Sequence, residues 1–170
     1  MLLVVSATAC GSRAGHVDIE RSFDVGWHDH ASSLDVEYTV SRLAFHGGRW
    51  SAEVSVHNGS SKPLFEVSWE PDPRHVTWYG PALVFSGKDV LGNRRLIYFP
   101  ADREQPTIPL PLRGGATWRG TVGGELPDTP PIPRGRPIWF RYPMFGIGQV
   151  WDELNPALAV QWISDKGVTL

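Results

Sequence analysis

The chain has 170 residues, of which 41% are hydrophobic and 20% charged, and its formal net charge at pH 7 is −2. This length and composition are typical of one globular domain and argue against an intrinsically disordered chain. Acidic and basic residues are interspersed along the chain and form no basic face, which argues against a nucleic-acid-binding protein.

Short strands and turns are favoured by the residue composition. The chain contains 18 glycines, 15 prolines and 8 tryptophans. This combination is more typical of an all-β domain than of a helical bundle. Cys10 is the only cysteine in the sequence, so an intrachain disulfide is excluded.

The N-terminal segment is short and apolar. Residues 2–9 read Leu-Leu-Val-Val-Ser-Ala-Thr-Ala and end in small residues directly before Cys10. A helix that spans a bilayer needs roughly 20 apolar residues, so this segment is too short for that role. It is typical instead of the apolar part and cleavage site of an export signal.

The run Ala7-Thr8-Ala9-Cys10 resembles the lipobox of bacterial lipoproteins. The resemblance implies a signal peptide over residues 1–9, lipid attachment at Cys10 and a lipidated tether over residues 10–16. Two acyl chains on one residue hold a protein stably to a membrane. The expected location is therefore the cell envelope, on the outer face of a membrane. The alternative is a buried N-terminal strand with an incidental cysteine.

From residue 17 to residue 170 the pattern predicts a single β-domain. Apolar and polar residues alternate over 34–41 and 50–57, and Gly47-Gly48 lies between them, so we expect a hairpin with one apolar face. Further strands are expected over residues 75–79, 82–86, 94–99, 107–112, 116–122, 137–143 and 157–163. The proline-rich segment 127–137 is expected to lack regular structure, and one helical turn is expected near Trp151–Leu154.

Many short strands separated by turns predict an antiparallel β-sandwich. Two segments resemble bacterial immunoglobulin-like accessory domains: Ala52-Glu53-Val54-Ser55-Val56-His57-Asn58-Gly59-Ser60 and Leu112-Arg113-Gly114-Gly115-Ala116-Thr117-Trp118. The resemblance implies an immunoglobulin-like sandwich but no particular activity, because such folds carry many functions.

His28 and His30 form the most distinctive polar cluster. On a strand, two histidines two residues apart share one face, which suits a zinc or copper site if a residue such as Asp24 supplies a third ligand. The alternative is a polar loop after Trp27 whose imidazoles are solvated.

The tryptophans fall into two groups. Trp50, Trp69, Trp118 and Trp162 occupy the apolar positions of their expected strands and are predicted to lie in the core. In another expected strand, Ile138, Phe140 and Tyr142 share one face, whereas Trp139 and Arg141 lie on the other. Either both faces of that strand are covered, or Trp139 and Arg141 lie on the surface.

Trp27, Trp78 and Trp151 are expected in loops or at strand ends. Together with Trp139 and Arg141 they would form a ligand-binding surface if exposed, because Trp and Arg contribute strongly to interfaces. The alternative is that they cap the open ends of the sandwich.

No catalytic motif is found. A Gly-x-Ser-x-Gly elbow and a glycine-rich phosphate loop are both missing from the sequence, so we expect neither an enzyme nor a cofactor. The sequence favours an envelope lipoprotein whose domain binds a partner or assembles at the cell surface. The alternatives are a carbohydrate- or peptide-binding module that uses the Trp and Arg side chains, a metal-binding protein centred on His28 and His30, and, by fold analogy alone, a protease-inhibitor-like domain.

Overall fold

The computed structural model of the chain describes residues 19–66, 80–88, 94–126, 135–147, 159–160 and 162–170. In these residues, twelve strands form three antiparallel sheets and there is no helix. The antiparallel all-β architecture is therefore confirmed for the described part of the chain.

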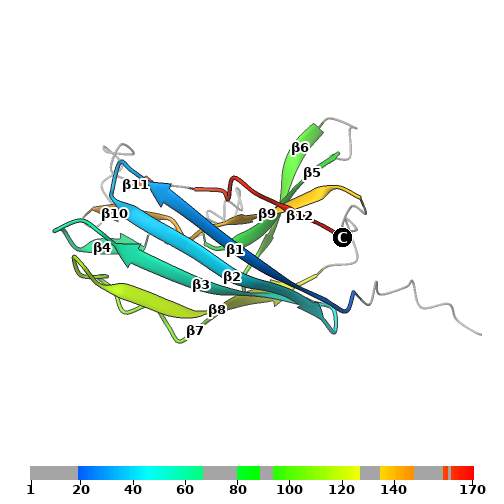
Figure 1. The fold of residues 1–170 in the computed structure, drawn as a ribbon, viewed down its shortest axis with the longest axis horizontal. Helices are drawn as coiled ribbons and strands as arrows, with labels where there is room; N and C mark the ends of the chain where they lie inside the picture. Colours follow the sequence, from blue (N-terminus) through cyan, green and yellow to red (C-terminus); the bar gives the residue numbers. More distant parts are fainter. Residues whose placement is uncertain (1–18, 67–79, 89–93, 127–134, 148–158, 161) are drawn as a thin grey trace, which may run out of the picture.

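The largest sheet has five strands in the order β1-β2-β3-β8-β7 (Figure 1). Its strands are β1 (Arg21–Ala31), β2 (Val36–His46), β3 (Arg49–Asn58), β8 (Thr117–Glu125) and β7 (Arg103–Gln105). A four-stranded sheet contains, in order, β12 (Val168–Thr169), β9 (Pro137–Arg141), β5 (Ala82–Lys88) and β6 (Arg94–Pro100). A three-stranded sheet contains β11 (Ala159–Val160), β10 (Phe145–Ile147) and β4 (Leu64–Glu66).

The hairpin expected over residues 34–57 is confirmed as β2 and β3. Gly47 and Gly48 connect the two strands with φ angles of +55° and +70°, which glycine adopts at low cost because it has no Cβ. The strands are in register with Tyr38 opposite Val56, so the buried residues of both strands share one face. The alternation in the sequence therefore places the apolar face of this sheet toward the core.

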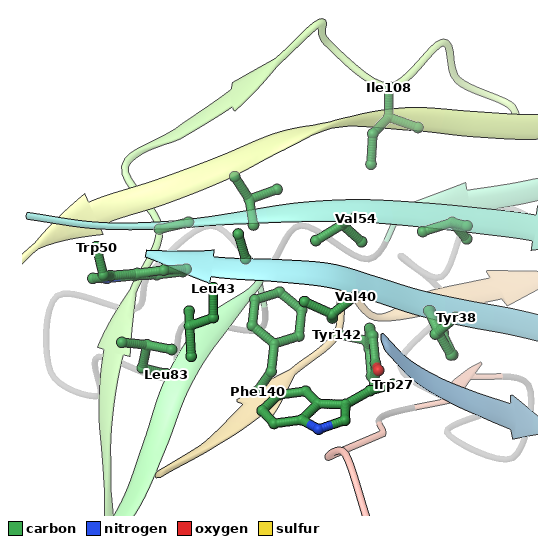
Figure 2. Packing of buried hydrophobic residues seen from close by; sticks show 14 of the residues in the cluster. Trp27, Tyr38, Val40, Leu43, Trp50, Val54, Leu83, Ile108, Phe140 and Tyr142 are labelled. Carbon is green, nitrogen blue, oxygen red and sulfur yellow. The ribbon is translucent and has the colours of Figure 1, made fainter. Parts of the chain in front are cut away.

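Aromatic rings join the two larger sheets, which face each other as in a β-sandwich (Figure 2). Trp50 of β3 meets Phe140 of β9 edge to face, with ring centroids 6.2 Å apart. Tyr38 of β2 stacks on Tyr142, which follows β9, at 4.4 Å. These four side chains are at most 1% exposed, so the core lies between the sheets.

Several predicted strands correspond to observed ones. β5, β6, β8 and β9 lie where strands were expected, and β11 lies within the last of the expected segments. The predicted strand over 107–112 is wrong. Pro106, Pro109 and Pro111 have no backbone N–H and cannot complete a ladder, so β7 forms just before them instead. Ile108 and Leu112 are nevertheless buried, which explains the apolar pattern.

Of the remaining sequence predictions, some concern described residues and the others fall outside them. Trp50 and Trp118 are buried as expected, and Trp162 is half-buried. The expected strand over 75–79, the expected turn at Trp151–Leu154, Trp69 and most of the proline-rich segment lie outside the described residues.

β1 is a strand, not a loop, at the histidine pair. A bulge interrupts its pairing with β2 between Asp24 and Trp27, and Gly26 takes a φ of +55° there. After the bulge, Trp27, Asp29 and Ala31 are buried. The residues between them therefore lie on the outer face of the sheet.

Candidate functional site

His28 and His30 lie exposed on the outer face of β1, but their imidazoles bind different carboxylates. His30 Nε2 lies 3.0 Å from Asp35 Oδ1, and His28 Nε2 lies 3.9 Å from Glu37 Oε2. Among the described residues, no three His, Cys, Asp or Glu side chains are grouped so that they could hold a metal ion. The two histidines share a face as predicted, but the described residues do not form the metal site that was one alternative.

Asp29, between these histidines, points into the core and ties β1 to the C-terminal part of the chain. Its carboxylate accepts a hydrogen bond of 2.6 Å from the Tyr142 hydroxyl and one of 3.3 Å from the Asp165 N–H. Burial, and next the hydrogen bond to Asp29, raise the pKa of Tyr142, and burial raises the pKa of Tyr38. Both tyrosines therefore stay neutral near pH 7, so neither can act as a general base.

Two residues of the predicted ligand-binding surface are buried, so the prediction that they bind a ligand is wrong for them. Trp27 is 5% exposed, because the bulge at Gly26 turns it toward the core, where Figure 2 shows it near Phe140 and Tyr142. Arg141 is 4% exposed. These two side chains stabilise the fold and are not available to a ligand.

The buried guanidinium of Arg141 is satisfied within the protein. Its Nε and one terminal nitrogen donate to the Gly80 carbonyl at 2.9 and 2.6 Å. Its central carbon also lies 4.9 Å from the centre of the Tyr98 ring, a cation–π contact. Trp139 is half-buried on the same face, whereas Cys10, Trp78 and Trp151 lie outside the described residues.

The outer face of the four-stranded sheet is apolar. Tyr98 of β6 lies opposite Val84 of β5, which in turn lies opposite Trp139 of β9. Their sequence neighbours face the core, so these three side chains lie on the face away from the five-stranded sheet. Val84 and Arg141 are buried and Trp139 is half-buried, so this face is covered over β5 and β9, which is one of the two expected arrangements, whereas it is more exposed at Tyr98.

Exposed apolar surface gathers on β6, at the edge of this sheet. The large apolar residues exposed in the described part of the chain are Leu96 (44%), Tyr98 (38%) and Leu110 (49%), and the first two lie on β6. Figure 1 shows the start of β6 projecting away from the five-stranded sheet, whereas the other end of β6 contacts β8. These residues are not among the predicted site residues. The signal was present, because Leu96-Ile97-Tyr98-Phe99 is apolar at every position and so predicts a strand with two apolar faces.

The backbone N–H and C=O groups of Leu96 and Tyr98 point away from the neighbouring strand β5. Ala101 N–H donates to the Pro81 carbonyl at 2.8 Å, in line with the register between β5 and β6. Hydrogen-bonded and non-hydrogen-bonded pairs alternate in an antiparallel ladder. Phe99 and Ile97 are therefore bonded to β5, whereas the N–H and C=O groups of Leu96 and Tyr98 face outward. Within the described residues, no strand pairs with that side of β6. We call this feature the open β6 edge.

Other sheet edges in the described structure are protected. β7, β4, β11 and β12 have three residues or fewer. β1 is long, but it carries the bulge at Gly26 and the inward-pointing charge of Asp29, which both disfavour pairing with another strand. Of the two long described edges, β6 is thus the one whose pairing has no bulge; its exposed charge, Arg95, shares a face with Ile97 and Phe99 near the start of the strand.

A second surface feature is a shallow polar groove on the outer face of the five-stranded sheet. Its volume is about 480 Å³, and its lining residues are Thr39, Ser41, Glu53, Val54, Ser55, Arg119, Gly120 and Thr121. The Ser41 hydroxyl donates to Glu53 Oε2 at 3.0 Å. The lining contains no imidazole or thiol, so the groove has hydrogen-bonding groups but lacks the usual nucleophile-and-base pair.

Comparison of the chain with models of known protein families, with curated proteins and with solved structures finds no match. No helix in the described ranges is long and apolar enough to span a membrane.

Proposed function

We propose that this protein is a non-catalytic lipoprotein of the bacterial cell envelope, whose immunoglobulin-like β-sandwich serves assembly or protein binding at the cell surface. The observation that carries the binding role is the open β6 edge, where exposed Leu96 and Tyr98 side chains coincide with outward backbone groups. Exposed apolar residues on an unpaired strand are a common means of strand addition between proteins.

The envelope location is supported by the sequence around Cys10. The run Ala7-Thr8-Ala9-Cys10 resembles a lipobox, and residues 2–9 are apolar and too short to span a bilayer as a helix. The first described strand begins at Arg21, so about ten residues separate Cys10 from the folded domain. Such a tether would let a lipid-anchored domain stay in water.

The immunoglobulin-like part of the proposal is supported by contacts between the two segments that carry the resemblance. Asn58, which is completely buried at the end of β3, donates from its side chain to the carbonyls of Leu112 and Lys62 at 2.9 and 2.7 Å. Its backbone bonds to Ala116 and Gly115 at 3.0 and 2.7 Å. The asparagine turn and the later glycine corner thus form one unit.

Intact mass and membrane fractionation test the anchor. The full chain is expressed in a bacterial host beside the variants Cys10→Ser and Ser12→Ala. We expect the wild-type protein and Ser12→Ala to lose residues 1–9, to gain the mass of acyl chains and to fractionate with membranes. Cys10→Ser is expected to lack the acyl mass and to leave the membrane fraction. An unmodified full-length wild-type chain in the soluble fraction would refute the envelope assignment.

A further inference from the structure

We propose that the open β6 edge is an interface between two copies of this chain. The two β6 strands would pair antiparallel about a two-fold axis that passes beside Ile97, and the two four-stranded sheets would become one continuous sheet. This inference rests on the proposed function and deepens it, because it names the assembly and the strand that forms it.

Backbone geometry selects a small set of registers. Only the outward groups, on Leu96, Tyr98 and their alternate neighbours Arg94 and Pro100, can bond to a partner strand. With the axis beside Ile97, Leu96 of each copy faces Tyr98 of the other in a hydrogen-bonded pair, and each pair exchanges two N–H···O bonds. Pro100 of each copy has no N–H, so the ladder ends at the Arg94–Pro100 pair on both sides of the axis.

Side-chain chemistry favours the same register. Leu96 and Tyr98 are 44% and 38% exposed, and pairing them across the axis would cover apolar surface on both copies. An aromatic and an aliphatic side chain form a favourable cross-strand pair. The guanidinium of Arg141 lies 4.9 Å from the Tyr98 ring centre, so the ring is already held in place before a partner arrives.

Charge placement is compatible with a second copy as the occupant and disfavours one other register. In the proposed register Arg95 lies opposite Phe99, and Arg94 lies opposite Pro100, so no two cations are paired. Moving the axis by two residues toward the start of β6 would set Arg95 opposite Arg95, and like charges directly opposite each other are destabilising. The strand is therefore complementary to itself in this two-fold arrangement, as an isologous interface requires.

Disulfide trapping tests the register. In the full chain with Cys10→Ser, the substitution Ile97→Cys places the only thiol beside the axis, in a non-hydrogen-bonded pair whose Cβ atoms come within about 5 Å. We expect mild oxidation to give a covalent dimer on a non-reducing gel. Thr121→Cys, exposed on the other sheet, is the control and is expected to stay monomeric. Equal or slower dimer formation by Ile97→Cys would refute the register.

Sedimentation of the full Cys10→Ser chain tests the interface without a thiol. We expect a reversible dimer whose dissociation constant rises at least tenfold with Leu96→Lys. Leu110→Lys changes an apolar residue of similar exposure away from β6, and it is expected to leave the dimer intact. Circular dichroism confirms that each variant is folded. A monomeric parent chain at the highest soluble concentration, or equal weakening by both variants, would overturn the proposal.

The two proposals can fail independently. A monomeric chain that still carries acyl chains would remove the self-assembly and leave the envelope anchor standing. A β6 dimer without acylation would remove the anchor alone. If Ile97→Cys crosslinks to a different protein in cells while the purified chain is monomeric, the edge binds a foreign strand and the second copy is refuted as its occupant.

Discussion

Removing the Tyr142 hydroxyl should destabilise the fold more than the same change at Tyr38. The Tyr142 hydroxyl donates to the buried Asp29 carboxylate at 2.6 Å, whereas the Tyr38 hydroxyl donates to the Pro143 carbonyl at 3.3 Å. A buried hydrogen bond to a charged group contributes about 1.5–3 kcal/mol, against about 0.5–1.5 kcal/mol for a neutral pair. Tyr142→Phe also leaves Asp29 with only the weaker bond from Asp165 N–H. We expect a loss of about 2 kcal/mol for Tyr142→Phe and at most about 1 kcal/mol for Tyr38→Phe.

The two variants control for each other, because the rings stack and each loses one oxygen atom. Urea unfolding of the full chain, followed by tryptophan fluorescence, gives the free energy of unfolding of each variant. In thermal unfolding, the loss at Tyr142 corresponds to roughly 4–8 °C for a domain of this size. If Tyr142→Phe lowers the free energy of unfolding no more than Tyr38→Phe does, the Asp29–Tyr142 hydrogen bond does not contribute the expected stability.

Two further predictions concern the pH dependence and the turn after β3. The pKa values of Tyr142 and Tyr38 are raised above 10.0 in the folded state, so these tyrosines ionise first in the unfolded chain and the free energy of unfolding should fall as pH rises above 10. Urea midpoints measured between pH 8 and 11 should decline less steeply for Tyr142→Phe than for the wild-type protein. An unchanged decline would contradict a raised pKa at Tyr142. Asn58→Ala should cost roughly 2–4 kcal/mol because the Lys62 and Leu112 carbonyls lose their donor. Ser60→Ala should cost less in the same urea assay, and equal losses would show that the asparagine contacts are not the main contribution.

The sequence predicts the β2–β3 hairpin well because two independent signals agree there. The period-two alternation identifies the buried face, and Gly47-Gly48 supplies a turn that accepts positive φ. The segment 107–112 shows how one signal alone misleads. Ile108 and Leu112 are buried, but the prolines between them remove the donors that a strand needs.

The candidate sites could be predicted only in part, because their geometry depends on contacts far apart in the sequence. The alternation rule places His28 and His30 on one face, but Asp35 and Glu37 on the neighbouring turn and strand determine where their imidazoles point. The prediction that Trp27 binds a ligand failed because the bulge at Gly26 shifts the strand register and turns Trp27 inward. The single glycine within the strand is a local signal for a bulge, but it does not determine which neighbouring side chains turn inward.

The two long edge strands, β1 and β6, differ in how well they are protected against pairing with another strand. Both are long edge strands in the described structure, yet β1 carries a bulge and a buried carboxylate, whereas β6 has a regular register and exposed Leu96 and Tyr98. An unprotected apolar edge invites uncontrolled association, and proteins usually disfavour it. On β6, Arg95 and Pro100 flank the apolar pair and restrict which strands can pair with it. An edge that is open in the centre and bounded at its ends is better suited to one specific partner than to general aggregation, which is the property that an assembly surface requires.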